Sequence, residues 1–233
     1  MTLMNSTSHF HRKIRSFMPR QGRMTMSQQI AIEQNWSIYG LTIDQAGYFA
    51  QLFPNSAPII MEIGFGNGQS LAAMAAANPH YNYLGIEVHK PGVGQLMNRL
   101  NQLQLTNVKI FQQDAVEILQ QIPDNSLSGI QLFFPDPWPK RCHHKRRLVN
   151  AEFVQLIHRK LKTGGYFHAA TDWLPYAEQI LSVLSANQGF KNTSINQMYC
   201  PRPDYRPLTK FEQRGLKLGH GVWDLIFISD LSK

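Results

Sequence analysis

Five acidic residues lie at or just after the end of a strand-like segment of this sequence: Glu62, Glu87, Asp114, Asp136 and Asp172. A carboxylate accepts hydrogen bonds from ammonium groups, sugar hydroxyls and amines, and it can offset a positive charge that develops in a reaction. One acid in such a place would be unremarkable. An acid at the end of each of these segments predicts a pocket lined with carboxylates.

A glycine-rich stretch follows the first of these acids and contains Gly64, Gly66 and Gly68 in the pattern GxGxG. Glycine permits a positive φ and lets a ligand approach the backbone closely. The dinucleotide-binding pattern GxGxxG is different, and a pyrophosphate would lie poorly beside Glu62. The alternative is a tight turn between a strand and a helix. The neighbouring acids favour a ligand site.

The acids around this stretch fit the parts of one cofactor. Glu62 suits an ammonium group. Glu87 lies about 20 residues after the glycine-rich stretch, where nucleotide-binding sheets hold the hydroxyls of a ribose. Asp114 can accept a hydrogen bond from an adenine amine. An adenosine with a positively charged amino-acid tail and no phosphate is S-adenosylmethionine, which we therefore expect as the cofactor.

The segment LFFPDPWPKRCHHKRR, residues 132–147, starts hydrophobic and ends basic. Pro135 and Pro137 restrict the backbone on both sides of Asp136 and predict a stiff loop. Trp138 offers a flat face for a base, and the basic residues after it offer charge for phosphates. The pattern PDPW resembles the [DN]PP[YFW] loop of nucleic-acid amino-methyltransferases, which act on exocyclic amines.

The residues alone leave two kinds of methyl acceptor open at Asp136. An exocyclic amine needs help to lose a proton as it is methylated. A ring nitrogen such as guanine N7 has an exposed lone pair, so it needs orientation more than a base. In that case Asp136 would hold the N–H groups of the guanine or offset the positive charge on the methylated ring.

The elements that must position these residues alternate along the chain. Strands are expected at Pro58–Ile63, Tyr81–Glu87, Val108–Phe111, Leu127–Phe134, Tyr166–Thr171 and Gly221–Ser229. Helices are expected at Asn35–Phe53, Gln69–Ala77, Val93–Leu103, Ala115–Gln121, Leu148–Leu161 and Trp173–Asn187. This alternation predicts an α/β fold, a doubly wound, mostly parallel, Rossmann-like sheet with helices on both faces. Ligands of such sheets bind at the carboxyl ends of the strands.

Charge is unevenly distributed along the chain, whose net charge is +8. Residues 1–32 and 140–147 each carry five Lys or Arg and no acid, and residues 201–220 carry five with two acids. Segregated basic runs attract polyanions, and nucleic acid is the expected partner. The alternative is that each run is only a solvated surface.

Composition limits the setting and the domain count. No apolar run is long enough to span a bilayer, no secretory signal is evident, and Cys142 and Cys200 form no CxxC pair, so we expect a cytoplasmic protein without a membrane span. Residues 1–28 lack periodicity and are expected to form a mobile basic arm. Residues 29–233 are expected to form one domain.

Longer motifs resemble those of bacterial tRNA (guanine-N7-)-methyltransferases. They are IRSFMPRQGRMT (14–25), EIGFGNGQSL (62–71), GIEVHKPGVG (85–94), FFPDPWPKRCHHKRR (133–147) and RPLTKFEQRGLKLGHGVWDL (206–225). These blocks run from the basic arm to the last expected strand, in the order of the family. The PDPW block with its basic run and the TKFE block are specific to that family, whereas the glycine-rich stretch is common to many methyltransferases.

The resemblance implies transfer of a methyl group from S-adenosylmethionine to N7 of a guanine in the tRNA variable loop, on a methyltransferase domain. It implies cofactor binding by Glu62, Glu87, Asp114, Asp136 and the three glycines, and a catalytic role beside the cofactor for Asp136. Substrate contacts are implied for Lys140, Asp172, Thr209, Lys210, Phe211 and Glu212. RNA contacts are implied for Cys142, His143, His144, Lys145, Arg146 and Arg147.

Some readings of these residues remain in competition. Asp172 could instead cap the helix that follows it. Adjacent Cys142, His143 and His144 cannot readily converge on one ion, so no metal is expected; the two histidines could make phosphate contacts depend on pH. Rival functions are an exocyclic-amine methyltransferase, a nicotinamide-dependent dehydrogenase and a non-catalytic RNA-binding protein. The chain is expected to act as a monomer or a homodimer.

Overall fold

The computed structural model describes residues 16–18, 22–219 and 221–230 of the chain. Within these residues an eight-stranded sheet has the order β1-β4-β3-β2-β5-β6-β8-β7. Its strands are β1 (Gly40–Leu41), β2 (Ile59–Ile63), β3 (Asn82–Ile86), β4 (Val108–Phe111), β5 (Leu127–Phe133), β6 (Leu161–Thr171), β7 (Phe190–Asn192) and β8 (Trp223–Ser229). All neighbours from β1 to β6 are parallel, and β8 is antiparallel to both β6 and β7.

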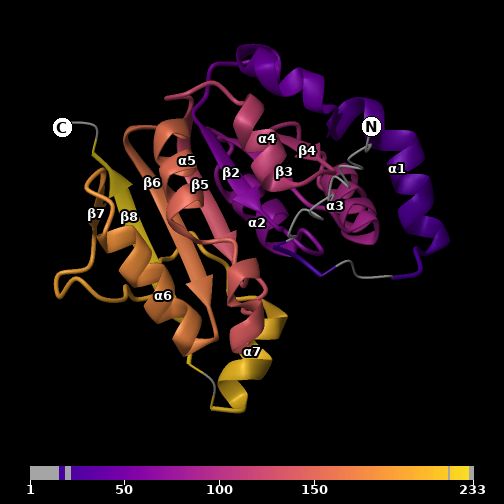
Figure 1. The fold of residues 1–233 in the computed structure, drawn as a ribbon. Coiled ribbons are helices and arrows are strands. Elements are labelled where there is room, and N and C mark those ends of the chain that lie inside the picture. The colour runs from indigo at the N-terminus through magenta and orange to yellow at the C-terminus, as the bar shows by residue number, and fades with distance from the viewer. Residues whose placement is uncertain (1–15, 19–21, 220, 231–233) are drawn as a thin grey trace, which may run out of the picture.

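Helices cover both faces of this sheet (Figure 1). The α-helices are α1 (Met26–Tyr39), α2 (Gln69–Ala77), α3 (Lys90–Gln102), α4 (Ala115–Gln121), α5 (Ala151–Lys160), α6 (Leu174–Ser185) and α7 (Lys210–Lys217), and residues Ile43–Gln51 and Arg141–Arg146 form 3₁₀ helices. One hydrophobic core joins α1, α2 and α3 to the sheet, and a second joins Ile43–Gln51, α4, α5 and α6 to it. The predicted doubly wound, mostly parallel α/β fold is confirmed.

The central strands are easy to predict because they are buried on both faces. All five residues of β2 and of β3 are buried, as is usual for parallel strands between two layers of helices. The predicted bounds of α2, α4 and β4 agree with the structure. The strand order reverses between the neighbouring central strands β2 and β5, and open α/β sheets bind ligands at the carboxyl ends of the strands at such a point.

The prediction of a first helix over Asn35–Phe53 was wrong. The chain forms α1 over Met26–Tyr39, followed by a short strand and a 3₁₀ helix. Thr25 caps the start of α1. Its side chain accepts a hydrogen bond from the N–H of Gln28, and the side chain of Gln28 accepts one from the N–H of Thr25. This capping box is visible in the sequence as Thr-x-x-Gln.

Several other bounds also differ from the prediction. Helix α5 begins only at Ala151, because the side chain of Asn150 caps it by accepting from the N–H of Phe153. Strand β6 begins at Leu161 and continues through Gly164, which has a φ of 77°. Strand β7 and helix α7 were not predicted. In the described ranges, none of the helices has the length and hydropathy needed to cross a bilayer.

Candidate active site

A cavity of about 510 Å³ lies at the carboxyl ends of β2, β3 and β5. Its walls come from parts of the chain that are far apart in sequence: residues 16–18, 62–70, 86–89, 132–136 and 206–209 contribute. The predicted convergence of strand-end acids is found here for Glu62, Glu87 and Asp136, which all line this cavity.

Glu62 lies in the cavity wall and forms no ion pair with another described residue. Its residue is 2% exposed, and within the described structure its Oε2 atom has no hydrogen-bond partner. Burial, and secondarily the negative charge of Glu87, raises the pKa of Glu62 to about 8. A buried carboxylate of this kind is costly until a positively charged group pairs with it. An ammonium group fits this requirement.

Glu87 holds the glycine-rich stretch in place. Its Oε2 accepts from the N–H of Gly66 at 2.8 Å, and its Oε1 accepts from the N–H groups of Val88 and His89 at 2.7 and 2.8 Å. Each carboxylate oxygen has two acceptor positions. Glu87 therefore shapes the loop and still presents acceptor capacity to the cavity.

The glycine-rich stretch adopts a backbone that other residues rarely adopt. The φ angles of Gly64, Gly66 and Gly68 are 73°, 58° and 69°. A Cβ atom at Gly66 would project into open space, whereas one at Gly68 would lie 2.5 Å from the Cβ of Leu96. The stretch thus leaves room beside its backbone at Gly66 and packs tightly against α3 at Gly68. Gly68 is also the N-cap residue of α2.

Gly92 in α3 also belongs to this site, although the sequence reasoning did not single it out. A Cβ atom there would collide with the carbonyl oxygen of Gly66. The glycine therefore lets α3 lie directly against the loop that lines the cavity. Its signal in the sequence is only its place in the motif GIEVHKPGVG.

Asp114, which was predicted to meet an adenine amine, lines a neighbouring cavity, and Gln113 beside it lines the main cavity. The carboxylate of Asp114 caps α4, its Oδ1 accepting from the N–H of Val116 at 2.8 Å, and Asp114 lines a neighbouring cavity of about 330 Å³. Gln113 lines the main cavity instead, and its buried Oε1 has no partner in the part of the chain described. An amine of a bound ligand could donate to that oxygen.

Asp136 is placed at the mouth of the cavity by a strained loop. Phe134 and Trp138, on either side of it, have φ angles of 52° and 46°, which are rare for residues other than glycine and cost about 1–3 kcal/mol each. The Oδ2 of Asp136 accepts from the N–H of Met18 at 3.0 Å. The amino-terminal segment 16–18 thus helps to orient this carboxylate.

The structure does not support Trp138 as a flat surface for a base. The residue is only 6% exposed, and its indole N–H donates to the carbonyl of Ser16 at 3.0 Å. The guanidinium of Arg146 lies 3.9 Å from the centre of the ring. Trp138 therefore anchors the amino-terminal segment and the basic run to the Asp136 loop.

The basic run, residues 140–147, lies outside the main cavity, and Arg141–Arg146 form a 3₁₀ helix. Its charged side chains are exposed or half-buried except for Arg147. Lys140, Cys142 and Lys145 are exposed, and His143, His144 and Arg146 are half-buried. Arg147 is 4% exposed, and it donates to the carbonyls of Pro137 and Pro175 and to the side chain of Gln179. Arg147 therefore stabilises the loop from inside, which argues against the predicted RNA contact.

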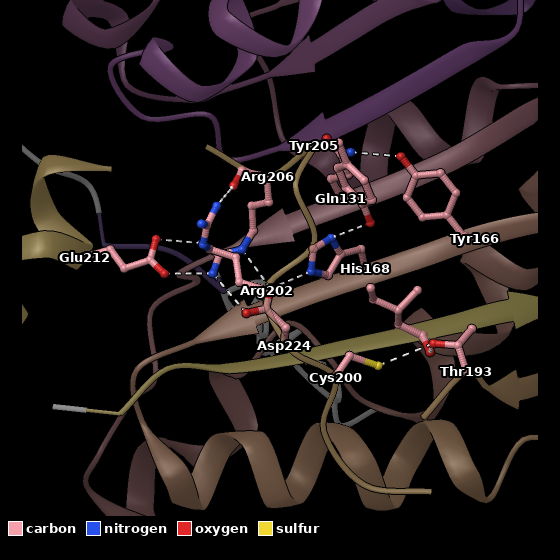
Figure 2. Close-up of polar contacts among 11 residues, drawn as sticks. Gln131, Tyr166, His168, Thr193, Cys200, Arg202, Tyr205, Arg206, Glu212 and Asp224 are labelled. Atoms are coloured by element: carbon pink, nitrogen blue, oxygen red, sulfur yellow. Dashed lines mark hydrogen bonds and ion pairs between the residues drawn. The ribbon is translucent and has the colours of Figure 1, made fainter. Parts of the chain in front are cut away.

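The remaining predicted substrate residues lie in different surroundings. Thr209 lines the cavity, whereas Glu212 is 3% exposed and bound by Arg206 (Figure 2). Asp172 is half-buried and does not cap α6, because the N-cap residue of this helix is Trp173. The N–H of Trp173 donates to the hydroxyl of Thr171. The side chains of Lys210 and Phe211 lie outside what the structure describes.

Within the described residues, no three or more His, Cys, Asp or Glu side chains form a group that could hold a metal ion. Cys142 is exposed and Cys200 is half-buried, and both are free thiols.

Known proteins similar to this chain decide its family. Residues 56–225 match the family model described as a putative methyltransferase. The tRNA (guanine-N(7)-)-methyltransferase of Hydrogenovibrio crunogenus is 57% identical over 93% of this chain and 91% of its own length. The protein of that name from Salmonella typhimurium is 55% identical, again over 93% and 91% of the two chains. The chain belongs to the tRNA (guanine-N(7)-)-methyltransferase family.

Solved structures of other methyltransferases share the fold of this family member at low sequence identity. The antibiotic-resistance methyltransferase Kmr has a TM-score of 0.54 at 14% identity, covering 83% of this chain and 95% of its own. An rRNA methylase from Streptococcus thermophilus has a TM-score of 0.52 at 13% identity, covering 80% and 95%. These likenesses concern the fold alone. They agree with the predicted methyltransferase sheet.

For a member of the tRNA (guanine-N(7)-)-methyltransferase family, the geometry separates the predicted residues into two groups. Glu62, Glu87, Asp136 and Thr209 face one cavity. Arg147 and Glu212 are buried: Arg147 donates to uncharged oxygens of the protein, and Glu212 is paired with Arg206. The first group faces the main cavity, whereas neither residue of the second group lines it.

Proposed function

We propose that the chain transfers a methyl group from S-adenosylmethionine to N7 of a guanine in the variable loop of tRNA. The observation that carries this proposal is that the buried acid Glu62, without a partner among the described residues, and the loop acid Asp136 line one cavity at the switch point of the sheet. Membership of the tRNA (guanine-N(7)-)-methyltransferase family supports the choice of substrate.

The residues of the cavity fit S-adenosylmethionine. Glu62 would pair with its ammonium group and Glu87 would accept from its ribose hydroxyls. Gln113 has a buried acceptor oxygen for the adenine amine, with Asp114 beside it. The open backbone at Gly66 leaves space for close approach. When bound, S-adenosylmethionine supplies an electrophilic methyl group on a sulfonium.

Asp136 would act on the guanine rather than on a proton. The N7 lone pair of guanine needs no base, because no proton leaves this atom as it is methylated. The ring becomes positively charged, and a carboxylate held at the cavity mouth stabilises such a charge. The hydrogen bond from Met18 fixes the direction of Asp136, so this stabilisation needs little reorganisation.

The exposed basic residues Lys140, Arg141 and Lys145 would bind tRNA phosphates beside the cavity, with the half-buried Arg146 contributing. Such contacts release counterions and make binding depend on salt. We also propose that residues 29–233 work as one domain with a basic arm before it, and that the enzyme acts in the cytoplasm as a monomer or homodimer without a metal.

Product analysis tests the proposed function. The protein is incubated with bulk tRNA and methyl-labelled S-adenosylmethionine, and the tRNA is then digested to nucleosides and separated by chromatography. We expect the label in N7-methylguanosine. Label in an exocyclically methylated nucleoside would indicate an amine methyltransferase, and absence of label with retained tRNA binding would indicate a non-catalytic RNA-binding protein.

A further inference from the structure

A buried network of charged side chains lies beside the cavity (Figure 2). At its centre is Arg206, which is 1% exposed. Its Nη1 and Nη2 donate to the two carboxylate oxygens of Glu212, both at 2.7 Å, and Nη2 also donates to Asp224 Oδ2 at 2.9 Å. A bidentate pairing of this kind fixes the relative orientation of the guanidinium and the carboxylate as well as their distance.

The network continues from Asp224 into the sheet. Asp224 on β8 lies 2.7 Å from Nε2 of His168 on β6, and the other ring nitrogen of His168 lies 2.9 Å from the hydroxyl of Tyr205. Burial lowers the pKa of His168. A neutral ring that donates from Nε2 to Asp224 and accepts from Tyr205 satisfies all three groups. Both Tyr205 and Arg206 are thus tied to the rigid sheet.

The same network shapes the TKFE motif. The hydroxyl of Thr209 accepts from the N–H of Glu212 at 3.1 Å, in the first turn of α7. Pro207 and Thr209 line the cavity together with Arg206 and Asp136. Glu212 itself is turned away from solvent and into Arg206, since both of its oxygens are engaged there.

The guanidinium of Arg206 also meets the loop that carries Asp136. It lies 5.7 Å from the ring centre of Phe134 and 5.9 Å from that of Phe133, within the range of a cation–π contact. These two aromatic residues immediately precede the Pro-Asp-Pro turn. Arg206 therefore joins the wall that bears Thr209 to the wall that bears Asp136.

Given the proposed function, we infer that Arg206 and Glu212, supported by Asp224, are positioning residues for methyl transfer. Their pairing sets Thr209 and Pro207 against Asp136 across the cavity where the guanine would lie. Glu212 acts through Arg206 and does not read the edge of the base. This assigns to the acid of the TKFE motif a different role from the substrate contact that the resemblance implies.

The test compares two tRNA transcripts, one with guanosine and one with inosine at the methylated position. Inosine keeps N7 but lacks the 2-amino group, which is a natural partner for a carboxylate that reads the base. The variants are Glu212→Gln, Arg206→Lys and the double variant, and Glu178→Gln on the exposed side of α6 is the control. Thermal unfolding and the KM for S-adenosylmethionine are measured for each variant.

We expect Glu212→Gln and Arg206→Lys each to lower kcat by about 100-fold on both tRNAs, as a misplaced reacting group does. The KM for S-adenosylmethionine should stay unchanged. The ratio of the guanosine rate to the inosine rate should equal that of the unaltered protein. The double variant should be no slower than the slower single variant, because the two residues work as one unit.

Other outcomes would overturn this inference. If Glu212→Gln lost activity only on the guanosine transcript while Arg206→Lys remained active, Glu212 would read the base. Losses that multiply in the double variant would show independent roles. If Glu212→Gln did not fold, Arg206→Lys and Asp224→Asn would carry the same comparison. An unaltered protein that methylated neither transcript would overturn the proposed function itself.

Discussion

Asp136 is the residue on which the proposed chemistry depends most. We expect Asp136→Ala to lower kcat/KM for methyl transfer by about 100-fold or more, because a preorganised charge at the reacting ring is lost. Binding of tRNA, measured by filter retention, should change little, since a carboxylate does not attract phosphates. Asp44→Ala, an exposed acid in the 3₁₀ helix Ile43–Gln51, is the control. A fully active Asp136→Ala protein would contradict the assigned role.

Glu62 should couple cofactor binding to proton release. Its pKa of about 8 leaves the side chain protonated at neutral pH, and an ammonium group would favour the ionised form. Binding of S-adenosylhomocysteine at pH 7 should therefore release close to one proton. Calorimetry in buffers of different ionisation enthalpy measures this release. Glu62→Gln should bind S-adenosylhomocysteine without releasing this proton. An equal proton release from the variant would show that the proton comes from another group.

The raised pKa of Glu62 should also make the free energy of unfolding depend on pH. The folded-state pKa of Glu62 lies above its ordinary value of 4.5, so the folded protein binds the extra proton between that value and about 8. The associated stability is fully present below pH 4.5 and is lost as the pH rises through 8. Bound cofactor should offset this loss, because it compensates the ionised form.

At the scale of elements, the packing of α3 on the glycine-rich stretch should be sensitive to one methyl group. Gly92→Ala would place a Cβ atom against the carbonyl of Gly66 and push the loop out of position. We expect the affinity for S-adenosylhomocysteine to fall about tenfold or more, the result of moving a ligand-binding backbone. Gly47→Ala, where a Cβ atom meets nothing within 4 Å, is the matched control. Equal affinities of the two variants would contradict this packing argument.

The basic run should divide into residues that bind tRNA and one that stabilises the loop. Lys145→Gln removes an exposed charge, so it should weaken tRNA binding. The slope of the logarithm of the binding constant against the logarithm of salt concentration should become shallower by about one. Arg147→Gln should instead lower the melting temperature, since Arg147 is buried and bonded to three other residues. An unchanged salt slope for Lys145→Gln would place the RNA elsewhere.

The elements around the site were predictable because their strands are hydrophobic throughout and end in acids. A parallel sheet brings such ends to one edge, so the convergence of Glu62, Glu87 and Asp136 follows from topology. Helix α1 was misplaced because Ala31, Asn35 and Tyr39 are its buried residues, which give no clear hydrophobic pattern. Its capping box at Thr25 was the better signal.

Contacts between distant segments could not be predicted from the sequence. The bond from Met18 to Asp136 spans 118 positions, and that from Trp138 to Ser16 spans 122. The pairing of Arg206 with Asp224 depends on β8 lying antiparallel to β6. Residue types therefore suggested that Trp138 faces a base, and the family resemblance implied that Glu212 contacts the substrate. Tertiary packing gives both side chains other partners.

At the scale of the whole molecule, three acids line the cavity and exposed basic residues lie outside it. The cavity wall carries Glu62, Glu87 and Asp136, while the exposed run around Lys140 and Lys145 adds to a net charge of +8. A polyanion is thus attracted to the surface and a positively charged cofactor to the interior. Residues 16–18 and 206–209 both line the cavity, so segments near the two ends of the chain complete the site.

The central claim is that N7 of a guanine receives the methyl group. After the modified position is mapped, two otherwise identical tRNA transcripts are prepared with guanosine or 7-deazaguanosine there, the latter carrying C–H in place of N7. Transfer of labelled methyl from S-adenosylmethionine is then measured on both. We predict methylation of the guanosine transcript and none of the 7-deazaguanosine transcript, although both bind. Equal methylation of the two transcripts would contradict the claim.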